Sequence, residues 1–234
     1  MTAPPKPLVI AIDGPSGSGK SSVSRAVAQR LNVAYLDTGA MFRALTWWCA
    51  HQGISLDDQP AVARAARDLP LQMGTDPYSP TVHVAGISLD EAIRTSEISE
   101  SVSKVATNLE VRAELRDRQR ALIAEAVENS GGVVAEGRDI TTVVAPYAHV
   151  RILLVADQDS RLARRSLELH GDADRAAVEA THDQIVRRDA DDSTVSQFMQ
   201  AAPGVTLVDT SDLDLQQSVE AVLGVVHTRT GREA

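Results

Sequence analysis

Short apolar runs alternate along the chain with longer segments whose apolar residues recur at helical spacing. The run Leu8–Ile12 predicts a buried strand. The segment after it places Val23, Val27 and Leu31 on one face of a helix. Similar apolar runs predict four more strands, at 34–36, 133–136, 150–156 and 205–209. Because strands and helices alternate, we predict an α/β fold with a parallel sheet and right-handed crossovers.

Further helices follow from the spacing of apolar positions. We expect them at about 38–51, 97–129 with a break near 107–108, 159–170 and 174–190. The last helix carries its apolar residues on one face: Leu215, Val219, Val222, Leu223 and Val226. Residues 70–90 differ, because three short apolar runs are separated there by Pro, Gly and Asp. They predict a small antiparallel β insertion.

Composition narrows the class of protein. Hydrophobic residues make up 43% and charged residues 24% of the chain, as in soluble globular proteins. The single cysteine, Cys49, excludes an intrachain disulfide and fits a reducing compartment. The stretch 1–7 holds three prolines and does not resemble a signal peptide, and no apolar run approaches a membrane-spanning length. We therefore expect a cytoplasmic protein with no membrane partner.

Charge argues against one class of partner. The net charge of −9 makes the chain a poor candidate for binding nucleic acid polymers. Its basic residues are 20 Arg and only 3 Lys. Arg presents a planar fork that suits bidentate contacts with phosphate, although a bias in codon usage explains the excess equally well.

A glycine-rich segment after the first predicted strand matches the phosphate-binding pattern G-x-x-x-x-G-K-[ST]. It consists of Gly14, Pro15, Ser16, Gly17, Ser18, Gly19, Lys20 and Ser21. An apolar strand precedes it and an amphipathic helix follows, which is the context that the motif requires. Lys20 can reach the β- and γ-phosphates, and the Ser21 hydroxyl can bind Mg²⁺. The motif is shared by GTPases, ATPases and small-molecule kinases, but the chain has no Asn-Lys dipeptide of the kind that reads guanine.

Two segments at the ends of predicted strands carry polar residues where open α/β sheets bind ligands. In the first, Asp37 and Thr38 begin a helix and Arg43 lies one turn further on. In the second, Arg138 and Asp139 follow Gly137, and this pair could hold a phosphate and a polar base or sugar group. The alternatives are a helix cap with a surface arginine, and a structural ion pair. Glu136 could also support a hydrated Mg²⁺.

A cluster of arginines predicts a lid. Arg161 and Arg165 share a helical face, Arg164 lies beside them, and Arg187 and Arg188 follow downstream. Phosphoryl transfer requires mobile arginines that close over the transferred group and exclude water. The alternative is a set of solvated helix charges paired with acidic neighbours.

Taken together, these segments resemble the bacterial cytidylate kinases. The resemblance runs from about Leu8 to Val226 and rests on GPSGSGKSS, LDTGAMFR, IRTSEISESVSKVA, VRAELRDRQR, EGRDITTVV, RLARRSLEL, RRDADDST and VDTSDL. It implies a single domain, 1–234, with a three-layer P-loop kinase fold and a five-stranded parallel sheet of order 2-3-1-4-5. The core would comprise 8–56 and 130–228, with an acceptor-side insertion at about 57–106 and an Arg-rich lid region at about 157–195.

The resemblance also assigns roles. It implies phosphorylation of CMP and dCMP by a monomer, with ATP as the donor and Mg²⁺ as the cofactor. The donor site would comprise residues 14–22, Ser22 included, with the lid arginines Arg161, Arg164 and Arg165. The acceptor site would comprise Asp37, Thr38, Arg43, Ser103, Arg112, Arg138, Asp139, Arg188 and Asp192. Ser103 and Arg112 would read cytosine, Arg188 and Asp192 would contact the ribose, and the catalytic residues would be Lys20, Arg138, Arg161 and Arg165.

One departure from the family leaves alternatives open. After Asp192-Ser193-Thr194 the family has an arginine of the acceptor site, but this chain has Val195 and the stretch is shorter. The preference between CMP, dCMP and UMP is therefore open. The rival interpretations are a kinase of another acceptor, such as UMP or a non-nucleotide alcohol, and a non-catalytic nucleotide-binding module.

Overall fold

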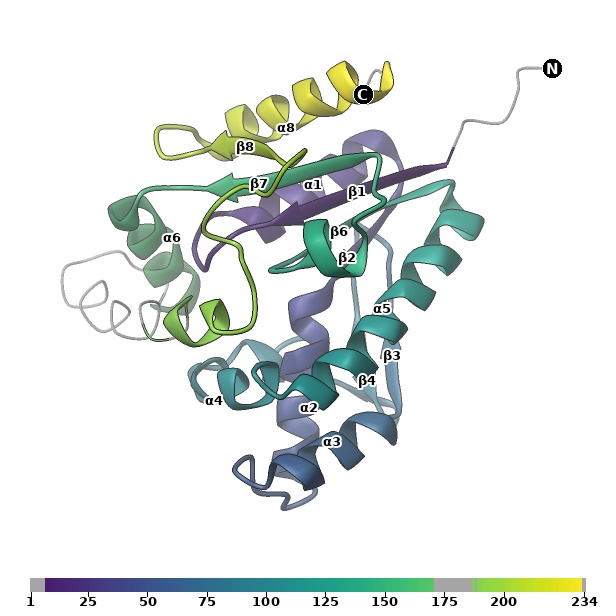
Figure 1. Cartoon of the computed structure of the whole chain (residues 1–234), viewed down its shortest axis with the longest axis vertical. Coiled ribbons are helices and arrows are strands. Elements are labelled where there is room, and N and C mark those ends of the chain that lie inside the picture. Colours follow the sequence, from purple (N-terminus) through teal and green to yellow (C-terminus); the bar gives the residue numbers. More distant parts are fainter. Residues whose placement is uncertain (1–6, 171–186, 188, 233–234) are drawn as a thin grey trace.

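The computed structural model describes residues 7–170, 187 and 189–232. Arg188 and most of the helix predicted at 174–190 lie outside the described residues. A five-stranded parallel sheet lies in the upper half of the molecule as drawn in Figure 1, and all five predicted strands are confirmed. They are β1 (Leu8–Asp13), β2 (Ala34–Asp37), β6 (Gly132–Gly137), β7 (Val150–Val155) and β8 (Thr206–Asp209). Their spatial order is β2-β6-β1-β7-β8, which is 2-3-1-4-5 when these strands are counted along the chain.

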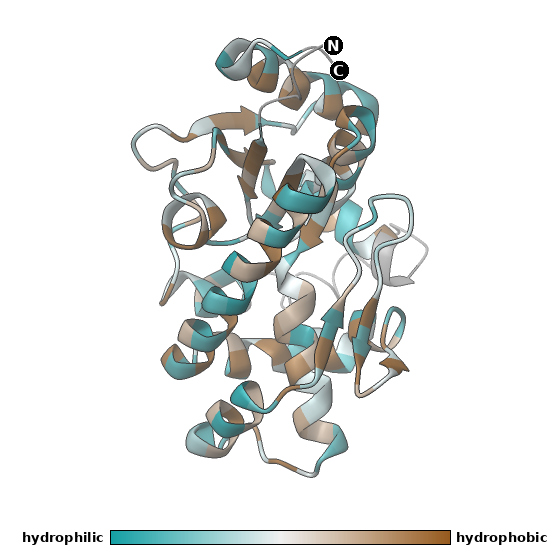
Figure 2. Cartoon of the chain, turned by 90° about the vertical axis from the view of Figure 1, so that its right-hand side faces the viewer, coloured by the Kyte–Doolittle hydropathy of each residue, from teal (hydrophilic) through white to brown (hydrophobic). Residues whose placement is uncertain are grey.

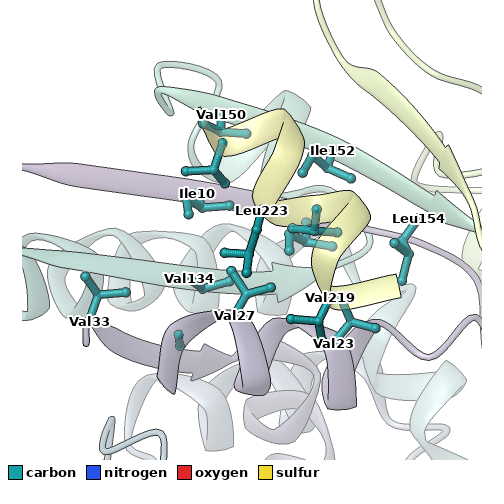
Figure 3. Packing of buried hydrophobic residues seen from close by; sticks show 14 of the residues in the cluster. Ile10, Val23, Val27, Val33, Val134, Val150, Ile152, Leu154, Val219 and Leu223 are labelled. Atoms are coloured by element: carbon teal, nitrogen blue, oxygen red, sulfur yellow. The ribbon is translucent and has the colours of Figure 1, made fainter. Parts of the chain in front are cut away.

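Helices α1 (Lys20–Leu31) and α8 (Leu215–Thr230) cover one face of this sheet. Branched aliphatic side chains from both helices meet Ile10, Val134 and Ile152 of the strands in a buried cluster (Figure 3). Such burial is the main stabilising contribution to the fold. The predicted apolar face of α8 is confirmed for its last four members, but Leu215 is 54% exposed. Leu215 is the first residue of the helix and lines a cavity described below.

Helix α5 (Leu109–Ser130) covers the opposite face, where Ile123 and Ala126 pack against β2 and β6. The predicted break before it is confirmed, since α4 (Ser96–Ala106) ends there and Asn108 caps α5 by accepting the backbone N–H groups of Glu110 and Val111. A turn of π-helix, η2 (Ile140–Val144), follows β6 on this same face. Two helical layers therefore enclose the sheet.

A second hydrophobic core lies beyond the carboxyl ends of the strands, and buried residues between 40 and 115 form it. Helix α2 (Thr38–His51) passes from β2 into it and packs against α4 and α5. The predicted antiparallel insertion is confirmed as β3 (Leu71–Met73), β4 (Val82–Val84) and β5 (Ile87–Ser88), followed by η1 (Ala92–Arg94). Helix α3 (Gln59–Arg67) was not predicted, because its buried face consists of three alanines and Val62, which give a weak apolar pattern.

Helix α6 (Gln158–His170) follows β7, and residues 189–199 return beside it toward the sheet. Hydropathy follows this layering, since the strands of the central sheet are brown in Figure 2 and the outward helix faces are teal. Among the described residues, no helix is both long and apolar enough to cross a membrane.

Candidate active site

The phosphate-binding loop connects β1 to α1 and leaves the first turn of that helix open. Gly19 caps α1 with a φ of 82° and, having no side chain, makes no cap hydrogen bond to the first turn of the helix. Gly17 has a φ of 75°, and a Cβ there would lie 2.4 Å from the backbone oxygen of Arg161. The glycines therefore permit a left-handed turn and close packing against α6. An open helix N-terminus favours a bound phosphate.

Lys20 and Ser21 begin α1 and face the end of β6. The Ser21 hydroxyl donates to Glu136 Oε1 at 2.6 Å, and the Tyr35 hydroxyl donates to the same oxygen at 3.3 Å. Burial raises the pKa of Glu136 to about 7, and the nearby charge of Asp37 adds to this rise, while Lys20 opposes it. Glu136 is therefore a carboxyl group held at the boundary between its neutral and charged forms near neutral pH.

Asp37 and Thr38 tie the end of β2 to the start of α2. Asp37 caps α2 by accepting the backbone N–H of Ala40 at 2.9 Å, and Arg43 Nη2 donates to its other oxygen at 2.7 Å. Burial raises the pKa of Asp37, but Arg43 and the Ala40 N–H outweigh it, so the pKa lies below its ordinary value. The Thr38 hydroxyl donates to the backbone oxygen of Glu136 at 2.8 Å. These contacts fix the two strand ends side by side.

Arg138 lies between the phosphate-binding loop and the segment after α6. Its Nε donates to Asp192 at 2.6 Å, and its Nη1 lies 3.3 Å from both Asp189 Oδ1 and the backbone oxygen of Gly14. The ring of Phe198 covers the face of the guanidinium at 4.5 Å. The guanidinium group is therefore held by carboxylates at its edge and by an aromatic ring on one face.

Arg112 and Asp139 form a second charged pair, which joins α5 to the end of β6. Arg112 Nη2 donates to Asp139 and also to the Ser196 hydroxyl, at 2.7 Å for the latter. Burial raises the pKa of Asp139 above its ordinary value, although Arg112 lowers it. The pair presents a guanidinium and a carboxyl group, which can both hydrogen bond to the polar edge of a base.

Asp13, the last residue of β1, organises the turn that follows β6. Its two oxygens accept the backbone N–H groups of Ile140 and Thr141 and the Thr141 hydroxyl at 2.6–2.8 Å. Burial raises the pKa of Asp13 to about 6, and the hydrogen bonds from Thr141 and Ile140 oppose this rise. The turn after Arg138 and Asp139 is thereby fixed to the strand that leads into the phosphate-binding loop.

Two adjoining cavities open between these elements. The larger, of ≈600 Å³, is lined by residues 16–23 of the loop and α1, by Arg94 and Ser99, by Arg164 and Arg165, and by residues 213–215. The smaller, of ≈70 Å³, is lined by Asp37, Thr38, Arg112, Asp139 and Ser196 among others. Lys20, Ser21, Asp37, Arg43 and Arg138 line both cavities. A ligand in one cavity would thus approach a ligand in the other at these shared residues.

Most of the predicted site residues meet at these cavities, but some do not. Ser103 is buried and lines neither, and Arg188 lies outside the described residues. Arg161 is also buried away from both cavities and pairs with Asp189. Arg164 lines the larger cavity, where its Nη groups donate to the backbone oxygens of Ser18, Thr210 and Leu213. The roles assigned to these residues in catalysis and binding stay predictions.

Sequence reasoning missed several residues of the site. Asp13 had one signal, an acidic residue at the end of an otherwise apolar strand. Arg94 and Ser99 belong to the insertion, and no pattern in the sequence connects them with the loop. Asp189 lies near the end of the expected lid region and Phe198 just after it, and their contacts with Arg138 depend on how the chain returns from α6.

Comparison with known proteins agrees with this geometry. The family model described as cytidylate kinase matches residues 10–228. A cytidylate kinase of Streptomyces avermitilis is 46% identical over 224 residues, covering 95% of this chain and 94% of that protein. One of Cutibacterium acnes is 49% identical over 221 residues, covering 94% and 96%. The solved structure of an uncharacterized protein from Eubacterium ventriosum shares the fold, with a TM-score of 0.51, 12% identity and coverage of 95% and 99%. The chain belongs to the cytidylate kinase family.

Proposed function

We propose that the protein transfers the γ-phosphoryl group of MgATP to the phosphate of CMP or dCMP, producing ADP with CDP or dCDP. The observation that carries this proposal is the arrangement of two adjoining cavities that share Lys20 and Arg138. One cavity contains the phosphate-binding loop and suits ATP. The other contains Arg43, Arg138 and the Arg112–Asp139 pair, and suits a small anion that carries a polar base.

The reaction depends on positioning and on charge. An oxygen of the acceptor phosphate attacks the γ-phosphorus, and the bond to the oxygen that bridges the β and γ positions breaks, with its electron pair leaving on ADP. The acceptor oxygen is already anionic, so no strong general base is required. Lys20 and Arg138 lie where they can meet the charge on the transferred group. The lid arginines Arg164 and Arg165 line the donor cavity from α6.

The cofactor that we propose is Mg²⁺, bound together with ATP. The hydroxyl of Ser21, which lines both cavities, and the carboxyl group of Glu136, which lines the smaller one, lie 2.6 Å apart, and Mg²⁺ prefers such oxygen ligands. Within the described ranges, no group of three His, Cys, Asp or Glu side chains could hold a metal ion. We therefore assign Ser21 as the protein ligand and Glu136 as its partner. The bound ion would neutralise charge on the β- and γ-phosphates.

Acceptor identity is assigned to the smaller cavity. Arg112 offers guanidinium donors, and Asp139 can accept from an exocyclic amino group or donate when protonated, so the pair suits cytosine. The alternative acceptor is UMP, because uracil has the same ring as cytosine, although it carries an oxygen at C4 in place of the amino group and a proton on N3, and because Val195 stands where the family has an arginine. We also propose that the enzyme acts as a monomer in the cytoplasm, where its single cysteine would stay reduced.

The test is ADP release from MgATP with CMP, dCMP, UMP and AMP offered separately. Fast release with CMP and dCMP alone is expected. Faster release of ADP with UMP would support the kinase activity but would identify UMP as the acceptor. ATP binding without acceptor-dependent release from any of the four would contradict the proposal and favour a nucleotide-binding module.

A further inference from the structure

Asp189 joins three parts of the site that are distant in the sequence. Its Oδ1 accepts the backbone N–H of Ser16 at 3.2 Å and lies 3.3 Å from Arg138 Nη1, while its Oδ2 accepts from Arg161 Nη1. Ser16 belongs to the phosphate-binding loop, Arg138 follows β6, and Arg161 lies in α6. One carboxylate thus connects both substrate sides with the helix that carries the lid arginines.

This junction is buried behind the cavity walls. The side chains of Asp189 and Arg161 are 9% and 10% exposed, and neither residue lines either cavity. Separating a buried ion pair leaves an unpaired charge in a region of low dielectric, which is costly. The two groups therefore stay in contact, and each holds the other in one orientation. Asp189 therefore acts on the site through its partners.

Arg138 is the partner that faces the substrates. Asp189 and Asp192 hold the edge of its guanidinium, and the Phe198 ring holds one face. A cation stabilises a developing charge most effectively when it is oriented before the reaction begins, since no reorganisation is then required. The contacts on Arg138 provide this orientation, and Asp189 also accepts a backbone N–H of the phosphate-binding loop.

We propose that Asp189 is a positioning residue: with Arg161 as its buried anchor, it holds Arg138 and the Ser16 end of the loop in the arrangement that receives the transferring phosphoryl group. This inference rests on the proposed phosphoryl transfer but not on the identity of the acceptor. The carboxylate is required because it accepts from all three donors. An asparagine would present an NH₂ group toward at least one of them.

The test compares Asp189→Asn with Asp191→Asn, an exposed aspartate two residues away on the same turn. The first readout is steady-state kinetics with whichever of CMP, dCMP, UMP and AMP the wild-type enzyme phosphorylates fastest. For Asp189→Asn we expect kcat to fall about 100-fold, the loss typical of a disturbed preorganised donor. The KM values for ATP and acceptor should change less than about threefold, because the loss affects the transition state and not ground-state binding. Asp191→Asn should match the wild type.

A second readout does not require an acceptor. The same proteins are assayed for slow hydrolysis of radiolabelled ATP, in which water receives the phosphoryl group, and Asp189→Asn should again be slower than Asp191→Asn. If the wild-type enzyme phosphorylates none of the four acceptors, the proposed function fails, and this comparison still decides the role of Asp189. Wild-type kcat in Asp189→Asn, or a rise in KM with kcat unchanged, would overturn the inference.

Folding is controlled separately. Thermal unfolding shows whether Asp189→Asn retains the native structure. If it does not, Asp189→Glu keeps the charge and displaces it by one methylene, and a displacement of about 1 Å is expected to lower kcat by at least about tenfold. A folded Asp189→Glu enzyme with wild-type kcat would equally overturn the proposal.

Discussion

Ser21 and Glu136, which are 115 positions apart in the sequence, share a hydrogen bond of 2.6 Å. It joins the first turn of α1 to the end of β6, so the phosphate-binding loop and the strand that leads to Arg138 and Asp139 are connected directly. Glu136 also accepts the Tyr35 hydroxyl, which gives its carboxyl group a fixed orientation. We infer that Glu136 orients Ser21 and supports the metal ion that accompanies ATP.

Replacing Glu136 tests that inference. In Glu136→Gln the Ser21 hydroxyl keeps an acceptor but loses a carboxylate neighbour, so the free Mg²⁺ concentration for half-maximal activity should rise about tenfold. The measurement is a Mg²⁺ titration at fixed ATP. Glu220→Gln, a surface glutamate paired with Arg30, is the control and should titrate as the wild type. An unchanged Mg²⁺ requirement in Glu136→Gln would exclude the metal role.

Lys20 is expected to be required for turnover and not for folding. Its residue lines both cavities, and the Nζ donates a long hydrogen bond, of 3.4 Å, to the Pro15 oxygen. Lys20→Ala should lower kcat by about 10³-fold, since it removes a positive charge where charge develops. Circular dichroism and thermal unfolding should match the wild type, and Lys104→Ala at an exposed ion pair should remain active. Near-normal turnover in Lys20→Ala is incompatible with the mechanism.

Asp13 predicts a pH dependence of stability. Burial raises its pKa from 3.8 to about 6 in the folded protein. Between these values the folded state binds a proton that the unfolded state has released, so stability falls as the pH rises through this window. The shift corresponds to about 3 kcal/mol. Relative to Asp13→Asn, the wild-type free energy of unfolding should therefore decrease by about that amount between pH 4 and 7.

Denaturant unfolding of both proteins across this pH range measures the difference. The comparison with Asp13→Asn cancels other titrating groups, because the two proteins differ at one position. A difference that grows with pH would mean that the hydrogen bonds from Ile140 and Thr141 outweigh burial and keep the carboxylate charged.

The sequence predicted the sheet well because its strands are short, apolar and buried on both faces. Leu8–Asp13 and Gly132–Gly137 are fully buried, so their composition alone indicates central parallel strands. Helix α3 was not predicted because its buried residues are mostly alanines, which give a weak apolar pattern. Leu215 was placed on the apolar face of the last helix by its helical spacing, but it is exposed and lines a cavity.

Residues of the site were predicted only where a residue type suited to ligand binding lies next to a strand end that the sequence pattern reveals. The loop residues and Arg138 lie next to strand ends, and parallel strands bring such positions together. Asp189 and Phe198 were missed because their contacts with Arg138 arise from the return of the chain after α6, which no local pattern encodes. Arg161 was predicted as a lid arginine from its helical spacing with Arg165; in the structure it is buried, its backbone packs against Gly17, and its role stays a prediction.

The Arg112–Asp139 pair predicts how the acceptor base is chosen. Arg112 extends from α5 into the smaller cavity, where it donates to Asp139 and Ser196. Arg112→Gln cannot supply the guanidinium fork, and a site that loses a hydrogen-bonding group discriminates poorly. We expect the KM for CMP to rise about tenfold or more, with the KM for ATP unchanged, because the side chain does not line the donor cavity. Arg116→Gln is the matched control, since Arg116 lies one turn along the same helix and pairs with its neighbour Asp117. If both variants bind CMP equally well, base recognition must be assigned to other residues of the cavity, and Ser196 would be the next position to replace.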